Sequence, residues 1–392
     1  MRKPWPTLLA LLALSGGAYA DEIPSARCAD TEMEKLLETA MRGLSGKPAR
    51  LLALSGGGQF GAFGAGFLRG WRESTEEPAR PELFEMVSGT STGALIATFP
   101  FLGTKADDDK IVAEYQNIRR DSDVYSNRFF FKLLWKDSLT TRHQFRRRLT
   151  DRAITPDVVR RVGEQGRLGR RLLVGAVDIE TGCFRYFDLT QLAQGVLADG
   201  VTEKQKEQLR QDYVDRLMAS SAIPVQFEPV LIQEKGHERP SVYVDGGVRR
   251  NLFIGPLMKA ATAFNVDLSV YIIFNGERGV DSVDRKQIMS GIKLAKLAGR
   301  AVSMLLDEST EGNLFRVYLQ LEELKQSHGA QNVKTEVRFT AIPPDVATEC
   351  GVRDEDEDKN FNGRTIDCLI KHGQRLGKSG KVWLNDPLAP IP

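Results

Sequence analysis

The stretch FEMVSGTSTGAL, residues Phe84–Leu95, decides how the chain is interpreted. It begins with an apolar run typical of a buried strand, passes through G-x-S-x-G, and ends in residues typical of a helix start. A serine at such a sharp strand-to-helix turn is the arrangement of a nucleophile elbow, where flanking glycines leave room for a strained backbone. The pattern therefore predicts Ser91 as a nucleophile, with Gly89 and Gly93 supporting the turn.

A glycine-rich loop, SGGGQFGAFGAG at Ser55–Gly66, precedes this elbow. Three of its glycines have the spacing G-x-G-x-x-G: Gly56, Gly58 and Gly61. One interpretation is a dinucleotide-binding loop, with Glu76 or Glu77 as the ribose-binding acid about 20 residues further on. The other is an oxyanion hole, because amides fixed at a helix N-terminus also hold the oxyanion of an acyl-transfer intermediate. The glycine spacing alone leaves both interpretations open.

A serine nucleophile needs a base, and PSVYVDGGVRRN at Pro240–Asn251 offers one. Asp245 follows a predicted strand, and Gly246 and Gly247 turn the chain after it. Ligand sites in open α/β sheets lie at the carboxyl ends of strands, so Asp245 is predicted to accept the Ser91 proton directly. A carboxylate with a reference pKa near 3.9 is a poor base at neutral pH, so its environment must compensate. The alternative is an aspartate that only caps the turn.

Histidine is the usual base for a serine nucleophile, but the four histidines of this chain stand in polar, loop-like or basic surroundings. No predicted strand would present His328 or His372 to the elbow, although either would suit the order Ser, Asp, His. Each is predicted to be a surface residue. The other two are His143 and His237.

A glycine loop after the first strand, then G-x-S-x-G, then D-G-G resembles the patatin-like phospholipase family over about Arg50–Pro256. MASSAIPVQFEPV at Met218–Val230 is also similar to that family. The resemblance implies a three-layer α/β/α fold with a mostly parallel sheet, and hydrolysis of lipid acyl esters by a Ser91–Asp245 dyad. No metal or other cofactor is implied. The implied oxyanion hole consists of backbone amides in the glycine loop, and its candidates are Gly56, Gly57, Gly58, Gln59 and Gly61.

The chain departs from the family pattern at two positions of the glycine loop. Ser55 stands where many members carry an acid, and Phe60 stands where many carry Arg or Lys. A lost cation weakens electrostatic help to an oxyanion or to a lipid phosphate. Two alternatives to a phospholipase therefore stay open: a general carboxylesterase or lysophospholipase with the same dyad, and a catalytically silent lipid-binding protein.

The first 20 residues have the three parts of a secretory signal peptide. Arg2 and Lys3 are followed by the apolar run Thr7–Leu14 and by Ala18-Tyr19-Ala20, so we expect cleavage near Ala20 and a periplasmic or secreted protein. Four cysteines follow, which permits disulfides in an oxidising compartment. We expect a Cys350–Cys368 disulfide, and Cys183 stays open as a free buried thiol.

Composition is that of a globular protein, with 41% hydrophobic residues and a net charge of +2, and nothing in it indicates nucleic acid. We expect a signal peptide at 1–20, a lead-in at 21–48, a catalytic domain at 49–345 and a disulfide-held extension at 346–392 without a strong period. Alternating strands and helices predict an α/β fold. The expected elements are strands at 50–55, 84–88, 171–178, 184–188, 242–244, 268–275 and 335–342, and helices at about 31–44, 62–73 and from 92.

Two weaker patterns were also considered. RFFFKLLWK at Arg128–Lys136 mixes aromatic and basic residues, which predicts either a transient contact with a membrane surface or a buried helix with a solvated basic end. DKNFNG at Asp358–Gly363 matches the first half of an EF-hand calcium loop. Its twelfth position is Leu369 instead of the required Glu, which favours a solvated acidic loop.

Overall fold

The computed structural model describes Cys28 and residues 31–43, 47–127, 140–234, 236–254, 260–261, 263–264, 266–276, 294–328, 334–352 and 361–389. The predicted signal peptide and the segment Arg128–Lys136 lie outside these residues. Within the described ranges, no helix combines the length and the apolar character that a membrane span requires.

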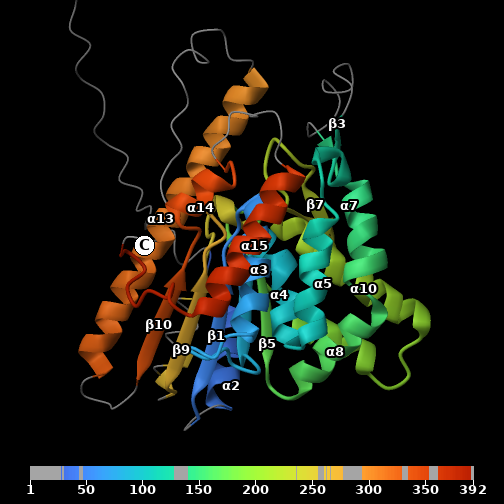
Figure 1. The fold of residues 1–392 in the computed structure, drawn as a ribbon. Coiled ribbons are helices and arrows are strands. Elements are labelled where there is room, and N and C mark those ends of the chain that lie inside the picture. Colours follow the sequence, from blue (N-terminus) through green and yellow to red (C-terminus); the bar gives the residue numbers. More distant parts are fainter. Residues whose placement is uncertain are drawn as a thin grey trace, which may run out of the picture.

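Strands and helices alternate through most of the chain (Figure 1). The strands are β1 (Ala49–Leu54), β2 (Met86–Thr90), β3 (Ser126–Asn127), β4 (Thr140–Thr141), β5 (Arg171–Asp178), β6 (Phe184–Asp188), β7 (Val230–Ile232), β8 (Ser241–Asp245), β9 (Leu268–Ile273) and β10 (Thr335–Thr340). The helices are α2 (Thr31–Arg42), α3 (Gly61–Arg72), α4 (Thr92–Leu102), α5 (Lys105–Gln116), α7 (His143–Arg148), α8 (Pro156–Arg167), α9 (Leu189–Gln194), α10 (Glu203–Ser220), α13 (Leu294–His328), α14 (Pro344–Glu349) and α15 (Gly363–Ser379).

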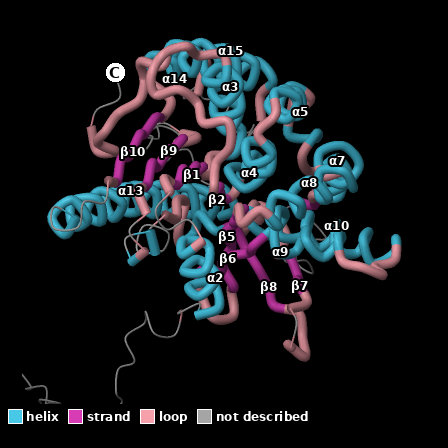
Figure 2. Tube along the Cα trace, turned by 90° about the horizontal axis from the view of Figure 1, so that it is seen from below, coloured by secondary structure: helices cyan, strands magenta, loops and turns pink. Residues whose placement is uncertain are grey.

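Eight of the strands form one sheet in the order β10-β9-β1-β2-β5-β8-β7, with β6 also paired to β5. The five strands from β10 to β5 run parallel, whereas β6 and β8 lie antiparallel to β5 and β7 lies antiparallel to β8. Figure 2 shows α3, α4 and α15 on one face of the sheet and α2 and α13 on the other. The predicted three-layer fold with a mostly parallel sheet is confirmed.

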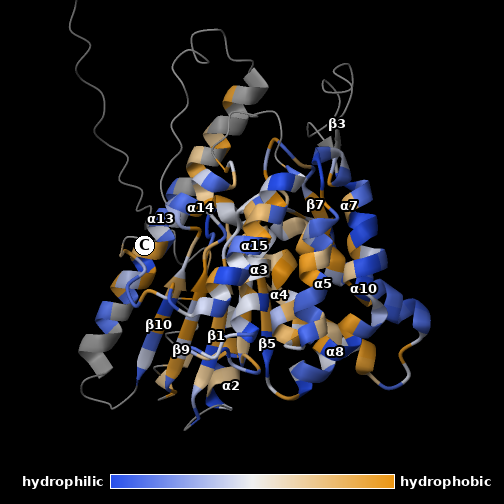
Figure 3. Cartoon of the chain, in the orientation of Figure 1, coloured by the Kyte–Doolittle hydropathy of each residue, from blue (hydrophilic) through white to orange (hydrophobic). Residues whose placement is uncertain are grey.

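Central strands of this sheet are apolar on both sides because helices cover both faces. In β1, Leu52 and Leu54 pack into the core on the α3 side, while Leu51 and Ala53 pack into the core on the α2 side. Figure 3 shows the same distribution, with hydrophobic residues concentrated in the central strands and in α4, and hydrophilic residues over α7. The central strands of the sheet are thus buried on both faces.

The C-terminal region contains a 17-residue helix, α15, which the sequence analysis did not anticipate. This helix packs backbone to backbone on α3: a Cβ added to Gly66 would lie 2.3 Å from Ile370 O, and one added to Gly373 would lie 2.3 Å from Phe63 O. Leu369 is fully buried and shares the main core. Helix α15 therefore belongs to the main hydrophobic core, and Leu369 offers no twelfth ligand for calcium; Asp358 lies outside the described residues.

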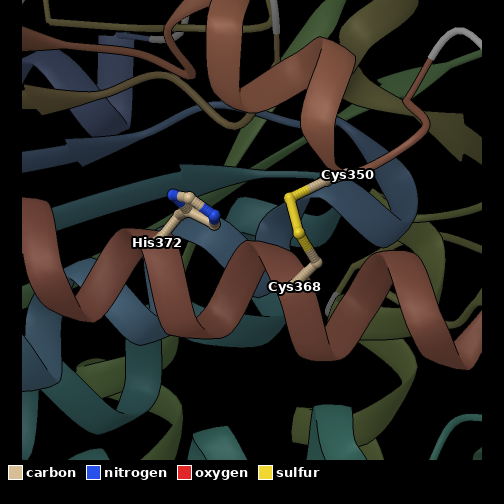
Figure 4. A group of neighbouring side chains, drawn as sticks. All are labelled: Cys350, Cys368 and His372. Atoms are coloured by element: carbon tan, nitrogen blue, oxygen red, sulfur yellow. A yellow bond between two sulfur atoms is a disulfide. The ribbon is translucent and has the colours of Figure 1, made fainter.

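Two disulfides fasten the chain. Cys350 pairs with Cys368, as predicted, and ties α14 to α15 (Figure 4). Cys183 is not a free thiol, because it pairs with Cys28 across a sequence separation of 155 residues. The second disulfide ties the N-terminal lead-in to the turn between β5 and β6, which sequence spacing alone did not reveal.

Candidate active site

Ser91 lies on the turn between β2 and α4, with φ 54° and ψ −125°. A non-glycine residue at positive φ stores about 1–3 kcal/mol of strain, which the surrounding structure must hold in place. Both flanking glycines are needed there: a Cβ on Gly89 would lie 2.4 Å from Gly93 O, and one on Gly93 would lie 2.3 Å from Leu54 O. The structure therefore has the strained elbow that the G-x-S-x-G pattern predicted, and Ser91 is only 7% exposed.

Asp245 is the last residue of β8, and the sheet register brings it close to the elbow. Strand β5 lies between the two: Thr90 pairs with Gly175 on one side, and Asp245 pairs with Ala176 on the other. The carboxyl ends of β2 and β8 thus meet across β5, even though β8 runs antiparallel to β5. Gly246 permits this approach, because a Cβ there would lie 2.5 Å from Gly175 O.

The Asp245 carboxyl group is 1% exposed. Its Oδ1 accepts a hydrogen bond from Gly247 N at 2.7 Å, whereas its Oδ2 has no hydrogen-bond partner of normal length among the described residues. Burial raises its pKa from 3.8 to about 6, against hydrogen bonding from Ser91 and Gly247 and the charge of Arg142, which lower it. The Ser91 hydroxyl is therefore near the carboxylate, in the loose arrangement common in free enzymes.

The glycine loop lies directly against Ser91. A Cβ on Gly56 would come within 2.8 Å of the Ser91 Cβ, so only glycine leaves the approach open. Gly57 has φ 151°, and a Cβ there would lie 1.6 Å from Asn275 O. The loop ends in a short 3₁₀ turn, Gly58–Phe60, that leads into α3.

Not all of the candidate amides in this loop are available to a substrate. Gly56 N donates to Asn251 Oδ1 at 2.6 Å, and Gly61 N donates to the carbonyls of Gly58 and Gln59. Among the described residues, the other three candidate amides donate to no acceptor, as expected for the first N–H groups of a helix. These are the amides of Gly57, Gly58 and Gln59, and they are the oxyanion donors that the geometry supports.

Ser55 and two asparagines that the sequence analysis did not single out, Asn251 and Asn275, hold the loop in shape. Ser55 Oγ donates to Gly56 O at 2.8 Å and accepts from Asn275 N at 2.8 Å. Asn275 Nδ2 donates in turn to Ser55 O at 2.7 Å. Asn251 also donates through Nδ2 to Thr310 Oγ1 on α13. The available signal was position, because Asn251 and Asn275 each follow shortly after a strand end.

Phe60 stands at the position where a cation was expected, and its side chain packs against the main hydrophobic core. The neighbouring Gln59 uses its Oε1 to accept from Asn362 N at the start of α15. The glycine loop is thus braced by α15 and carries no cationic side chain of its own.

Histidines do not complete this site. Among the described residues, no hydrogen bond joins a histidine to Ser91 or Asp245. His143 and His237 are exposed. The prediction of a surface position is wrong for His372, which is 9% exposed on α15 beside the Cys350–Cys368 disulfide, with Nε2 3.1 Å from Glu349 Oε1 (Figure 4). Both sulfurs of that cluster are in the disulfide, so they offer no thiolate to a metal.

The dinucleotide interpretation does not fit the fold. Glu76 and Glu77 lie beyond the C-terminal end of α3, and a 12-residue helix places them about 18 Å from the glycine loop. A Cβ on Gly380, just past α15, would lie 2.6 Å from the Glu76 Cβ, so this acid faces the far end of α15. Neither acid can contact a ribose held at the loop.

The model of the patatin-like phospholipase family matches residues 52–258, which is more than half of the chain. VipD from Legionella pneumophila is a similar solved structure, with a TM-score of 0.38 and 13% identity over 86% of this chain and 68% of that chain. No curated protein matches the chain. The chain belongs to the patatin-like phospholipase family and is a patatin-like lipid acyl hydrolase.

Proposed function

We propose that the protein hydrolyses acyl esters of phospholipids through a Ser91–Asp245 dyad. The observation that carries the proposal is a buried carboxylate with one unpaired oxygen beside a strained serine. Because the pKa of Asp245 is raised to about 6, the carboxylate is ionised at neutral pH yet basic enough to accept a proton. A turn-capping aspartate would need neither the burial nor the unpaired oxygen.

In the acylation step, Ser91 Oγ attacks the ester carbonyl carbon while Asp245 Oδ2 takes the hydroxyl proton. The carbonyl oxygen becomes the oxyanion of a tetrahedral intermediate, held by the amides of Gly57, Gly58 and Gln59. The intermediate collapses, and the leaving alcohol or lysolipid takes the proton from Asp245. Water then attacks the acyl-serine with Asp245 again as the base, which releases the fatty acid.

Phospholipid is the substrate class we favour, and export is part of the same proposal. The predicted signal peptide and the two disulfides support a periplasmic or secreted protein that meets lipids in an oxidising compartment. The absence of a cation at Phe60 keeps a general carboxylesterase or lysophospholipase as the second candidate.

Labelling with a fluorophosphonate, followed by assays on a panel of phospholipids, lysophospholipids and short-chain esters, tests the proposal. We expect labelling of wild type and release of fatty acid from diacyl phospholipids, and neither in Ser91→Ala. Ser88→Ala is the matched control, because Ser88 is a buried serine on β2, the strand that leads to Ser91, and its Oγ donates to Phe253 O at 3.4 Å. A folded wild type that resists the probe supports the silent lipid-binding alternative instead.

A further inference from the structure

The turn Ser220–Ala222 accepts hydrogen bonds from the backbone amides of both members of the proposed dyad. Ser220, the last residue of α10, accepts from Ser91 N through its Oγ at 3.0 Å and donates to Gly175 O at 2.6 Å. Two residues later, Ala222 O accepts from Asp245 N at 2.8 Å. The distance between nucleophile and base therefore depends on the position of this turn, Ser220–Ala222.

Arg142 holds that turn from outside. Its side chain, at the start of α7, donates from Nη1 to Ser221 O at 2.7 Å and to Ser221 Oγ at 2.9 Å, and from Nη2 to Met218 O at 2.9 Å. The guanidinium also lies over the Phe227 ring, 4.7 Å from its centre. A cation at the C-terminal carbonyls of a helix is favourable, because those carbonyls lack intrahelical donors and carry partial negative charge.

The charge of Arg142 is buried, since the residue is 5% exposed, and no carboxylate within the described residues forms an ion pair with it. Burial lowers the pKa of Arg142 to about 10, and the negative charge of Asp245 opposes that fall. Arg142 is therefore charged at neutral pH, and its positive charge interacts with the negative charge of Asp245.

The other charged side chains near β8 interact with partners other than Asp245. A Cβ on Gly182 would lie 3.6 Å from the Arg249 guanidinium, and Arg250 donates to Tyr186 Oη. Glu234 accepts from Tyr243 Oη, and Asp178 accepts from Thr181 Oγ1. On α10, Asp215 pairs with Arg146. Arg142 is thus the cation that acts on Asp245 among the described side chains.

We propose that Arg142 is a positioning residue of the hydrolase: it fixes the turn that spaces Ser91 from Asp245, and its buried positive charge acts on the Asp245 carboxylate. This proposal rests on the proposed dyad mechanism. During acylation the negative charge moves from the Asp245 carboxylate to the substrate oxyanion, so the buried site stays anionic throughout. A fixed cation nearby compensates that charge at every stage, and an arginine remains protonated while it does so.

The test compares Arg142→Gln and Arg142→Lys with a matched buried arginine. Arg170 is 7% exposed, donates to the carbonyls of Phe84 and Phe101, and lies over the Phe101 ring, but it stands at the start of β5, five to six residues before the site. Each variant is assayed for kcat/KM between pH 4.5 and 9 on a soluble ester, with fluorophosphonate labelling rates and a melting curve in parallel.

We expect Arg142→Gln to move the acid limb of kcat/KM upward by about one pH unit, at the low end of what losing an opposite charge does. Arg142→Lys should keep the wild-type limb with a lower kcat, and Arg170→Gln should keep the limb although it lowers the melting temperature. The proposal is overturned if the acid limb of kcat/KM does not move in Arg142→Gln. It is also overturned if Arg142→Gln and Arg142→Met both fail to fold while Arg170→Gln folds, because the role of Arg142 would then be purely structural.

Failure of the dyad itself gives a different result. If Asp245 is not the base, the kcat/KM profile of wild type has no acid limb near pH 6, or Asp245→Asn keeps its activity. Neither result depends on the Arg142 variants.

Discussion

Replacing Asp245 by Asn should make the protein more stable at pH 8 while it abolishes activity. The folded protein binds the Asp245 proton more tightly than the unfolded chain does, with a pKa of about 6 against 3.8, because burial disfavours the charged form. The contribution of Asp245 to the free energy of unfolding is therefore largest below pH 3.8 and falls as the pH rises to 6, since the folded state must give up a proton that it holds more tightly than the unfolded chain does. At 1.36 kcal/mol for each pKa unit, the ionised carboxylate costs about 3 kcal/mol at pH 8.

Asparagine removes that cost and keeps the acceptor for Gly247 N. Its new Nδ2 takes the place of the unpaired Oδ2, and a poorly paired buried amide costs about 1 kcal/mol. The net gain is about 2 kcal/mol. For 392 residues, an unfolding entropy of about 2.1 cal/mol/K per residue converts this gain to a rise in Tm of about 2 to 3 °C.

The assay is thermal and denaturant unfolding of both proteins at pH 8 and at pH 5. The difference in free energy of unfolding between Asp245→Asn and wild type should be about 1.4 kcal/mol smaller at pH 5, where Asp245 of the folded wild type is mostly protonated. Asp107→Asn is the control of opposite sign. Burial works to raise the Asp107 pKa, but hydrogen bonds from Arg161 and Thr104 outweigh it and the pKa is lowered, so that variant should be less stable than wild type at pH 8. The reasoning is refuted if Asp245→Asn is less stable than wild type at pH 8, or if the stability difference between the two proteins is the same at pH 8 and pH 5.

Four further predictions follow from the site and its supports. Wild-type kcat/KM should fall tenfold per unit below about pH 6, as Asp245 becomes protonated; a flat profile from pH 8 to 5 contradicts the assigned base. Ser91→Gly should be about 1–2 kcal/mol more stable than Ser91→Ala in unfolding assays, because glycine accepts φ 54° without strain, and equal stabilities would argue against a strained elbow. Gly57→Ala should abolish fluorophosphonate labelling and lower the Tm, since its Cβ would overlap Asn275 O; full labelling would exclude this loop as the oxyanion site. Removing Cys28–Cys183 should destabilise by about 5 kcal/mol and removing Cys350–Cys368 by about 3 kcal/mol, from loops of 155 and 18 residues, and the reverse order of melting temperatures contradicts the loop-entropy account.

Local patterns carried most of the fold prediction. Strands β5 and β6 fall where the sequence placed them, because two short runs rich in apolar residues are separated by the turn residues Glu180–Gly182. Strand β2 was placed two residues too early, since Phe84 looks like a strand residue but instead packs its ring near Trp71, with ring centres 6.1 Å apart. Helix α15 was missed because Gly373 and Gly377 look like helix breakers in the sequence, and only the structure shows that both lie against the backbone of α3.

Those candidate site residues could be predicted that stand in a short local motif. A serine between glycines and an aspartate before Gly-Gly are local signals, and both residues stand at adjoining strand ends. Arg142 gave no such signal, because its role depends on contacts with Ser221 and Met218, more than 70 residues away in the chain. Such supports can only be found once the turns of α10 and β8 are placed together.

Helix α15 has a consequence for when this enzyme becomes competent. It packs on α3 through backbone contacts and braces the glycine loop through the Asn362 N to Gln59 Oε1 hydrogen bond, across a sequence separation of 303 residues. A chain that emerges from the ribosome, N-terminus first, cannot make these contacts until α15 has been synthesised. A polypeptide that stops before α15 can thus carry both Ser91 and Asp245 and still lack the braced glycine loop.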